Sequence, residues 1–447
     1  MVVTTTKGYK QTDLGIIPEA WGIKSLNEIS SMHGRIGWQG LKESEFTMNS
    51  EEPYLVTGMN FKDGAITWDE IYHISMKRYE MARDIQLKPN DVLMTKDGTI
   101  GKILFIDEIP YPCKASLNSH LLVFRPVGDS YFPRFLYYLL QSRFFRNHIE
   151  LNKSGSTFFG ISQEAVGKFR VALPKKQEQE SIALSLSDLD KLINTLNQFI
   201  EKKKLIKQAA MQELLPGKKR LPGDWITTKT KKMTDLGLIP EDWGIKNLSD
   251  LCAKDGLVRG PFGGSIKKEF FVEDGIKVYE QKNAIYRDIQ LGTYFIDYRK
   301  FSELKRFEVF SGDFIISCSG TIGRVYQIPE NAPKGIINQA LLKITLNSNI
   351  IFDKYFFYYF EWEDFQKKIV DSTQGGAMKN LVGMNEFRNT LVALPASKDE
   401  QYAIAQVFMN MDSEIEALEQ ERDKYKQLKV GLMQQLLTGR IRLKWKS

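Results

Sequence analysis

Cysteine and histidine are scarce in this chain of 447 residues, and their scarcity excludes several kinds of chemistry. The three cysteines, Cys113, Cys252 and Cys318, lie far apart and form no CxxC pair. Their spacing argues against a disulfide framework and against a zinc site of ordinary spacing, and it favours a reducing, cytoplasmic compartment. The four histidines are scattered and indicate neither a metal site nor a catalytic triad.

Long apolar runs and targeting signals are also missing. The first ten residues contain no apolar stretch of the kind found in secretory signal peptides, so we expect none. No apolar run approaches the ~20 residues that are needed to span a bilayer.

The net charge is weakly positive: 62 Lys and Arg against 55 Asp and Glu give a formal net charge of +7. That excess suits a nucleic-acid-binding protein but is thin for a chain of this length.

Motifs of catalysis are absent as well. The sequence has no GxxxxGK[ST] phosphate-binding loop and no Asn/Asp-Pro-Pro-Tyr tetrapeptide of amino-methyltransferases. Glu201-Lys-Lys203 spells the Glu-x-Lys of nucleases, but it lies inside a long helical pattern with no strand aspartate before it. We therefore expect a non-catalytic chain that itself binds no metal and no cofactor.

What the chain does contain is a long internal repeat. The segment TDLGIIPEAWGIK at 12–24 recurs as TDLGLIPEDWGIK at 234–246, an offset of 222 residues. The same offset relates Gly-Thr-Ile-Gly at 98–101 to the copy at 320–323. One offset along the whole chain, too long for a solenoid period, predicts two copies of a module made of a domain and a helix.

The two copies diverge between these matched segments. Arg-Ile-Gly-Trp-Gln-Gly at 35–40 has no obvious counterpart in Arg-Gly-Pro-Phe-Gly-Gly at 259–264. One reading is that a single scaffold was kept twice and carries two different surfaces; the other is neutral drift of loops. Residues 26–174 and 247–395 are domain-sized and mix strand and helix signals. Each has an aromatic segment near its end, at 131–145 and 352–365, which we expect to be a helix with core-forming rings.

A long helical pattern follows each module after Pro174 and Pro395. Ser397 and Glu400 form a capping-box pattern at the start of the second helix, and Gly217 and Gly439 follow a Leu-Leu-x stop. Apolar residues recur in alternating steps of four and three, which is typical of a coiled-coil seam. The predicted seam residues are Ile182, Leu186, Leu189, Ile193, Leu196, Ile200, Ile404, Phe408, Met411, Ile415, Leu418 and Tyr425. We expect the two helices to pair antiparallel as a rod about 57 Å long, at ~1.5 Å per residue.

The order of these motifs resembles the specificity (S) subunit of type I restriction-modification enzymes. The likeness is carried by the Pro-Glu-x-Trp start, the Gly-Thr-Ile-Gly turn, the Ala-Leu-Pro…Glu-Gln passage into a long helix, and the duplication of all three. It covers essentially the whole chain. The resemblance implies two target-recognition domains, each reading half of a split site on double-stranded DNA. It also implies helices that set the gap and dock methyltransferase (M) subunits, two in number, with motor-nuclease (R) subunits joining them. S-adenosylmethionine, ATP and Mg are then expected in those partner subunits.

Residues that could contact DNA are the polar and basic side chains of the divergent loops, because arginine suits guanine and Asn or Gln suits adenine. Lysine and arginine beside the Gly-Thr-Ile-Gly turns are candidates for backbone contacts. In the first module the candidates are Arg35, Trp38, Gln39, Lys42, Lys96, Lys102, Asn118, His120, Lys153, Ser154 and Thr157. In the second module they are Arg259, Phe262, Ser265, Lys267, Gln281, Asn283, Arg324, Asn338, Gln339, Gln374 and Lys379. For each, an ordinary solvated loop residue is the alternative.

The sequence thus predicts an α+β protein with an internal pseudo-twofold repeat. Its expected parts are a repeat-start segment at 1–25, a recognition domain at 26–174, a long helix at 175–215, a linker with the second start segment at 216–246, a second recognition domain at 247–395, and a last helix with tail at 396–447. Three alternatives stay open: the specificity subunit of another split-site methylation system, a coiled-coil scaffold that touches no DNA, and a free-standing nuclease or methyltransferase, which the missing motifs disfavour.

Overall fold

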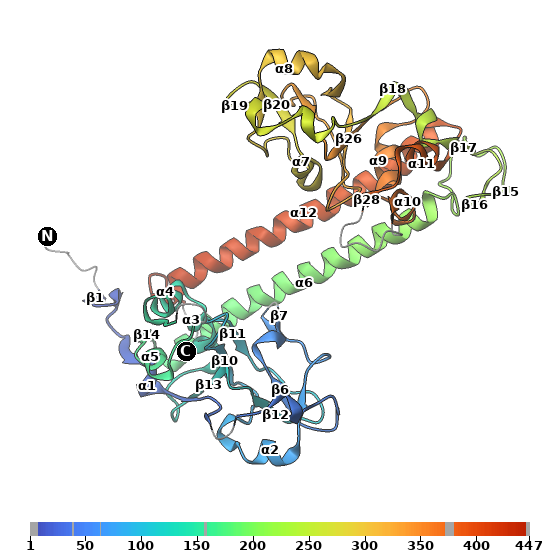
Figure 1. Ribbon diagram of the computed structural model, residues 1–447. Coiled ribbons are helices and arrows are strands. Elements are labelled where there is room, and N and C mark those ends of the chain that lie inside the picture. Colours follow the sequence, from blue (N-terminus) through green and yellow to red (C-terminus); the bar gives the residue numbers. More distant parts are fainter. Residues whose placement is uncertain (1–7, 38–39, 63, 156–158, 372–379, 444–447) are drawn as a thin grey trace. The chain divides into compact units, whose positions relative to one another are not determined.

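The computed structural model describes residues 8–37, 40–62, 64–155, 159–371 and 380–443. The chain forms two compact units, one of residues 1–197 with 420–447 and one of residues 198–419. Each unit contains one globular module and parts of both long helices, and Figure 1 labels many of the elements. The two units are described separately below.

The module of the first unit is built around a four-stranded antiparallel sheet in the order β11-β10-β13-β4. Its strands are β4 (Ser30–His33), β10 (Val92–Thr95), β11 (Ile103–Phe105) and β13 (Leu121–Pro126). One face packs on α3 (Pro133–Leu140) and α4 (Arg143–Asn152), with the rings of Phe124, Phe135 and Phe145 in a shared core. The start segment closes the module, because β3 (Gly22–Ser25) pairs antiparallel with β14 (Arg170–Leu173).

A second sheet, β12-β6-β9-β5, covers the other face and has its own apolar cluster. Its strands β6 (Tyr54–Val56) and β12 (Ala115–Leu117) run parallel. The remaining elements of this module are β5 (Phe46–Thr47), β7 (Phe61–Lys62), β8 (Ala65–Ile66), β9 (His73–Ile74), α1 (Leu26–Ile29), α2 (Met76–Glu80) and α5 (Gln163–Gly167). The mixed sheets and helices agree with the predicted α+β class.

The second unit repeats this plan. Its inner sheet has the order β18-β26-β23-β24, with β18 (Cys252–Arg259), β23 (Phe314–Ser317), β24 (Val325–Gln327) and β26 (Leu341–Leu346). Its outer sheet has the order β19-β21-β20-β25-β22, and β20 (Ile276–Tyr279) runs parallel to β25 (Gly335–Ile337). The other elements are β17 (Gly244–Asn247), β19 (Phe271–Val272), β21 (Phe295–Ile296), β22 (Glu308–Val309), β27 (Val370–Asp371), β28 (Asn380–Leu381), β29 (Leu391–Leu394), α7 (Gln281–Tyr286), α8 (Tyr298–Glu303) and α11 (Met384–Asn389).

The aromatic segment of each module is two helices, and the expectation of one continuous helix was wrong. The first breaks after α3, where Ser142 accepts a hydrogen bond from the Phe145 amide and caps α4. The second breaks at Trp362, between α9 (Asp353–Glu361) and α10 (Glu363–Ile369). The rings form core in both cases, as predicted, since Phe135, Tyr138, Tyr355 and Phe356 are buried.

The long helices are α6 (Lys176–Leu214) and α12 (Lys398–Leu436). Within the second unit, Lys207 near the end of α6 lies 2.5 Å from Asp412 near the start of α12. Within the first unit, Lys429 near the end of α12 lies 2.6 Å from Asp190 near the start of α6. The end of one helix meets the start of the other in each unit, so the helices pair antiparallel, as predicted.

The predicted seam residues lie on the inner faces of these helices. Buried are Ile182, Leu186, Ile193, Leu196, Ile200, Ile404, Phe408 and Ile415, and half-buried are Leu189, Met411, Leu418 and Tyr425. The first turns of each helix also pack on a module: Ile182 and Leu186 belong to the core of the first, and Ile404 and Phe408 to the core of the second. The same side chains therefore hold helix to domain as well as helix to helix.

Each start segment packs against the end of a long helix. In the first unit β1 (Tyr9–Thr12) and β2 (Gly15–Pro18) form a hairpin, and Pro18 and Trp21 contact Gly439 after α12. In the second unit β15 (Lys231–Thr234) and β16 (Gly237–Pro240) form the same hairpin, and Pro240 and Trp243 contact Gly217 after α6. Both glycines have positive φ, 69° at Gly217 and 67° at Gly439, as the predicted helix stops require.

A buried glutamate joins these pieces. Glu400, expected in a capping box, instead accepts a hydrogen bond from the Trp243 indole at 3.1 Å and pairs with Arg220. Its equivalent Glu178 bonds in the same way to Trp21 and Arg442. The cap of α12 is supplied by Ser397 alone, whose hydroxyl accepts from the Asp399 amide.

Among the described residues, no helix is long and apolar enough to cross a membrane. The same residues contain no cluster of three or more His, Cys, Asp or Glu side chains that could hold a metal ion. The three cysteines are free thiols, and burial raises the pKa of Cys252 to about 12 and that of Cys318 to about 11.

Candidate nucleic-acid interface

The Gly-Thr-Ile-Gly turns have the same internal geometry in both modules. In the first, the hydroxyl of Thr95 donates to the Thr99 carbonyl at 2.5 Å and accepts from the Lys102 amide at 3.0 Å. In the second, Ser317 makes the two equivalent bonds at 2.6 and 3.0 Å. All four glycines of these turns have positive φ, which residues with a side chain rarely adopt. The exposed Lys102 and Arg324 follow the two turns directly.

Three loops of the first module meet beside its turn. The Lys96 amide donates to the His120 carbonyl at 2.9 Å, and the Gly98 amide donates to the Phe159 carbonyl at 3.1 Å. Asp97 lies 3.2 Å from both the Lys96 ammonium and the His120 imidazole. The Lys153 ammonium stands over the Phe159 ring at 5.0 Å. The structure thus brings together the predicted residues Lys96, His120, Lys153 and Ser154.

The second module has a groove of about 470 Å³ at the corresponding end of its inner sheet. Four of the predicted residues line it, namely Arg259, Phe262, Ser265 and Gln339. The lining also contains Arg306 and Arg388 and no carboxylate. Within the described part of the chain, the side chains of these three arginines make no hydrogen bond and no ion pair. A groove with three uncompensated guanidinium groups attracts anions, and DNA phosphate is one of the anions that guanidinium binds in two-point geometry.

Arg306 and Arg388 were missed in the sequence analysis because neither belongs to a conspicuous motif. Arg306 lies in a 3-10 turn at Lys305–Phe307, and Arg388 lies on the short helix α11. Both are exposed, and only the fold brings them to the loop at 259–264. The one local signal was the Lys-Arg pair at 305–306, which alone does not distinguish a ligand site from a solvated surface.

Two predicted residues point inward. Arg35 is 6% exposed, and its guanidinium donates to the Leu117 carbonyl at 2.8 Å and to the Ser116 hydroxyl at 3.0 Å. Burial lowers the pKa of Arg35 to about 10. Asn283 is 0% exposed, and its amide donates to the carbonyls of Asp288 and Leu291. These side chains are occupied in holding loops together, so we leave them out of the proposed interface.

The equivalent Asn118 and Asn338 shape the turns before the central strands. The Asn118 side-chain oxygen accepts from the Ser119 amide at 2.6 Å, and that of Asn338 accepts from the Ala340 amide at 3.0 Å. Of the other candidates, Lys42 and Lys267 are exposed and Gln281 is half-buried, all away from the groove lining. Trp38, Gln39, Thr157, Gln374 and Lys379 lie outside the described residues.

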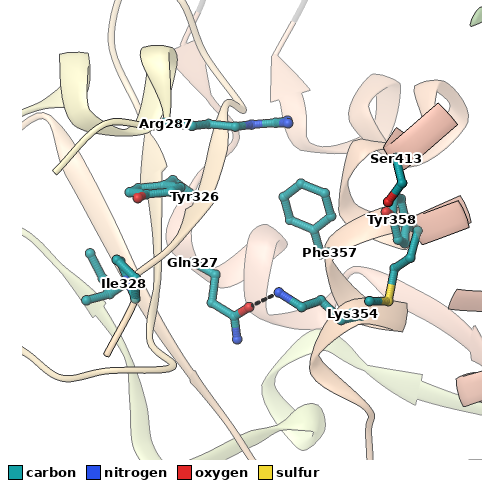
Figure 2. A pocket seen from close by; sticks show the side chains of 10 residues that line it. Arg287, Tyr326, Gln327, Ile328, Lys354, Phe357, Tyr358 and Ser413 are labelled. Carbon is teal, nitrogen blue, oxygen red and sulfur yellow. Dashed lines mark hydrogen bonds between the residues drawn. The ribbon is translucent and has the colours of Figure 1, made fainter. Parts of the chain in front are cut away.

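A second hollow of this unit, of about 410 Å³, lies where α9 and α12 face strand β24 (Figure 2). Its two cations are engaged: Arg287 pairs with Glu361, and Lys354 donates to Gln327 at 2.6 Å. None of the predicted DNA-contact residues lines it. We therefore place the candidate interface at the arginine groove and at the turn-side loops.

Comparisons with known proteins bear on the family and the fold of the whole chain. A family model described as type I restriction modification DNA specificity domain matches residues 18–208 and 240–427. The MjaVIII specificity subunit of a type I restriction enzyme from Methanocaldococcus jannaschii is 25% identical over 370 residues, 81% of this chain and 81% of the relative. The EcoBI specificity subunit from Escherichia coli is 24% identical over 373 residues, 80% of this chain and 75% of the relative.

A solved structure shares the fold. The S subunit of a type I restriction-modification system from M. genitalium superposes with a TM-score of 0.53 at 13% identity, covering 98% of this chain and 99% of that one. The family model matches twice, once in each repeat, and the two matches together span more than half of the sequence. The chain therefore belongs to the family of type I restriction-modification DNA specificity subunits, with two target-recognition domains.

Proposed function

We propose that each module of this chain reads one half of a bipartite DNA site and that the paired helices set the spacer between the halves. The recognition domains are residues 26–174 and 247–395. The observation that carries the proposal is the arginine groove of the second module, whose lining holds three guanidinium groups and no carboxylate. Arginine beside Gln339 and Ser265 supplies both phosphate contacts and the hydrogen-bonding groups that base edges require.

The two modules would read different half-sites because their equivalent loops differ in chemistry. In the first module Arg35 folds inward and Asp97 places a negative charge between Lys96 and His120. In the second module, the loop at 259–264 borders a groove whose charged lining residues are all arginines. A carboxylate can accept a hydrogen bond from the cytosine amino group, which arginine cannot do.

The chain would act without catalysis of its own. Two methyltransferase subunits would dock along α6 and α12, and motor-nuclease subunits would join the complex. S-adenosylmethionine, ATP and Mg would serve those partners. Such an assembly acts on chromosomal DNA, which makes the cytoplasm its compartment.

The test exchanges residues 26–174 for the corresponding module of another family member in the assembled methyltransferase complex. Methylome sequencing should show one half-site replaced, with the second half-site and the spacer retained. If both half-sites stayed as they were, the assignment of one module to each half would be wrong.

A protein scaffold that touches no DNA is the competing function. The complex containing this chain should lose DNA affinity steeply as salt rises, because phosphate contacts release counterions. A scaffold would show no DNA retention even at low salt. Two copies of the Gly-Thr-Ile-Gly turn, each followed by an exposed cation, favour the DNA reader.

A further inference from the structure

The loop at 259–264 has a well-defined backbone but holds the Phe262 side chain exposed to solvent. Phe262 is 91% exposed, the largest exposure among the large apolar side chains in the described part of the chain. The neighbouring Pro261 is buried, and the Ser265 amide donates to the Phe262 carbonyl at 2.8 Å. The backbone is thus fixed on both sides of a side chain that packs on nothing.

Gly260 anchors the base of this loop. Its amide donates to the Leu341 carbonyl at 2.9 Å, and a Cβ at this position would stand 1.8 Å from the Asn338 carbonyl oxygen. Only glycine allows so close an approach of the loop to the turn before β26. The ring is therefore held out from the end of the inner sheet by a defined backbone and does not hang from a loose loop.

The surroundings of the ring indicate what it would contact. Arg259, Arg306 and Arg388 line the same groove and leave it strongly cationic. The ring is almost fully exposed and lines the groove, so its face is available to a ligand that the groove binds. A flat aromatic face among guanidinium groups matches a flat base among phosphates, whereas an apolar protein partner would leave three buried charges unpaired.

We propose that Phe262 stacks on a base of the half-site read by the second module, entering the stack at one step while the arginines hold the flanking phosphates. This inference rests on the proposed function. Apolar wedges unstack DNA locally, and pyrimidine–purine steps yield most easily. Phe262 would thus select for a deformable step without a hydrogen bond to any base.

The loop of the first module begins differently, because the Arg35 side chain is folded inward, whereas Arg259 lines the groove of the second module. The inference therefore concerns the half-site read by the second module.

The test uses the assembled methyltransferase complex and duplexes with 2-aminopurine placed at each step of the two half-sites. The wild-type complex should raise the fluorescence at one step of the second half-site. Phe262→Ala should remove that signal and weaken binding by about 5- to 150-fold, the range that corresponds to loss of one base–aromatic stack. Phe262→Trp should keep both.

Two further variants distinguish stacking by Phe262 from the effect of losing a positive charge in the groove and from the effect of losing any exposed ring. Arg388→Ala should keep the fluorescence signal and lower the slope of log affinity against log salt by about 0.9, as for one phosphate contact. Tyr286→Ala removes a ring that is 70% exposed in the same unit but outside the groove, and it should change neither readout.

The contrary outcomes are distinct. If Phe262→Ala bound DNA with unchanged affinity and fluorescence, the stacking role would be refuted and the proposed function would stand. If Phe262→Ala assembled poorly with the methyltransferase subunits while the assembled fraction bound DNA normally, the ring would be a protein contact and the inference wrong. A wild-type complex that bound no DNA would overturn the proposed function and this inference with it.

Discussion

Two buried glutamates occupy equivalent positions in the two units, and each one joins distant parts of the sequence. Glu178 and Glu400 are each 1% exposed and each accept from a tryptophan indole and from an arginine. A carboxylate so far from water is tolerated only while its charge is compensated. The arginine comes from the chain beyond the end of the other long helix, so each pair joins distant parts of the sequence.

Arg442→Met should therefore lower the free energy of unfolding by about 3 kcal/mol, because it leaves the Glu178 carboxylate buried without a cation. Thermal unfolding of the whole chain measures the effect. Arg440→Met is the matched control, since Arg440 is exposed two residues earlier and should matter little. Equal melting temperatures for the two variants would contradict this role of Arg442.

Lys343 is a second residue whose burial has a measurable consequence. It occupies the place of Val123 in the equivalent strand, is 7% exposed, and donates to the Glu308 carbonyl at 2.6 Å. Burial lowers the pKa of Lys343, although the Asp313 carboxylate 4.0 Å away opposes this. The unfolded chain then holds the proton more firmly than the folded one, so the stability of the fold rises with pH up to the ordinary lysine pKa of 10.5.

Lys343→Met removes this penalty and should raise the unfolding free energy by about 1 kcal/mol at pH 7. The gain should shrink as the pH approaches 10.5, where wild-type Lys343 loses its proton in either state. Denaturant titrations at several pH values provide the measurement. Lys334→Met, at an exposed position, should show no such pH-dependent gain. A gain that grew with pH would refute the argument.

At the scale of the element, the turn at 98–101 is set by one hydroxyl. Thr95→Val keeps the shape of the residue but removes the bonds to the Thr99 carbonyl and the Lys102 amide. We expect the turn to loosen and DNA affinity of the assembled complex to fall about fivefold, the worth of roughly 1 kcal/mol. Thr95→Ser should be neutral, because serine at 317 makes the same bonds in the second module. Equal binding by both variants would count against a role for the turn.

Elements with a strong local signal could be predicted from the sequence. The apolar steps of four and three, with the glycine stops, located α6 and α12 to within about a residue. The break between α3 and α4 was not foreseen, because a serine cap inside an aromatic run is a weak signal next to so much buried ring surface. Glu400 matched a capping box locally, but a tertiary ion pair with Arg220 takes its carboxylate.

The candidate interface was harder to predict than the elements. Phe262 and Arg259 could be named because they lie in the loop where the two copies differ most. Arg388 could not, because it lies more than one hundred residues along the chain and reaches the groove only through the pairing of β17 with β29 and the placement of α11. Arg35 was also predicted to contact DNA, yet its side chain binds carbonyl and hydroxyl acceptors inside the first module.

At the scale of the molecule, the sequence repeat and the compact units are different divisions of the chain. The repeat offset divides the chain near residue 222, whereas each compact unit takes the start of one long helix and the end of the other. Leu436 and Leu437 complete the core of the first module, just as Leu214 and Leu215 complete that of the second. The offset of 222 residues shows only that two copies exist. Tertiary contacts determine which helix end packs on which start segment.

If the paired helices set the spacer, as proposed, then their length should determine the DNA site. Deleting 198–201 from α6 and 418–421 from α12 leaves the Lys207–Asp412 and Lys429–Asp190 pairs in place and removes about one turn from each helix. At ~1.5 Å per residue the rod loses about 6 Å, which corresponds to one or two base pairs at ~3.4 Å each.

Methylome sequencing of cells that express the deleted chain with its partners should then show both half-sites unchanged and the spacer shortened by that amount. Deletion from α6 alone should put the antiparallel ion pairs out of register and lower the melting temperature, which separates helix length from helix pairing. An unchanged spacer in a well-folded double deletion would show that the helices do not set the gap. The spacer is the appropriate readout because, in the proposed function, module loops read the bases and the paired helices set the distance between the half-sites.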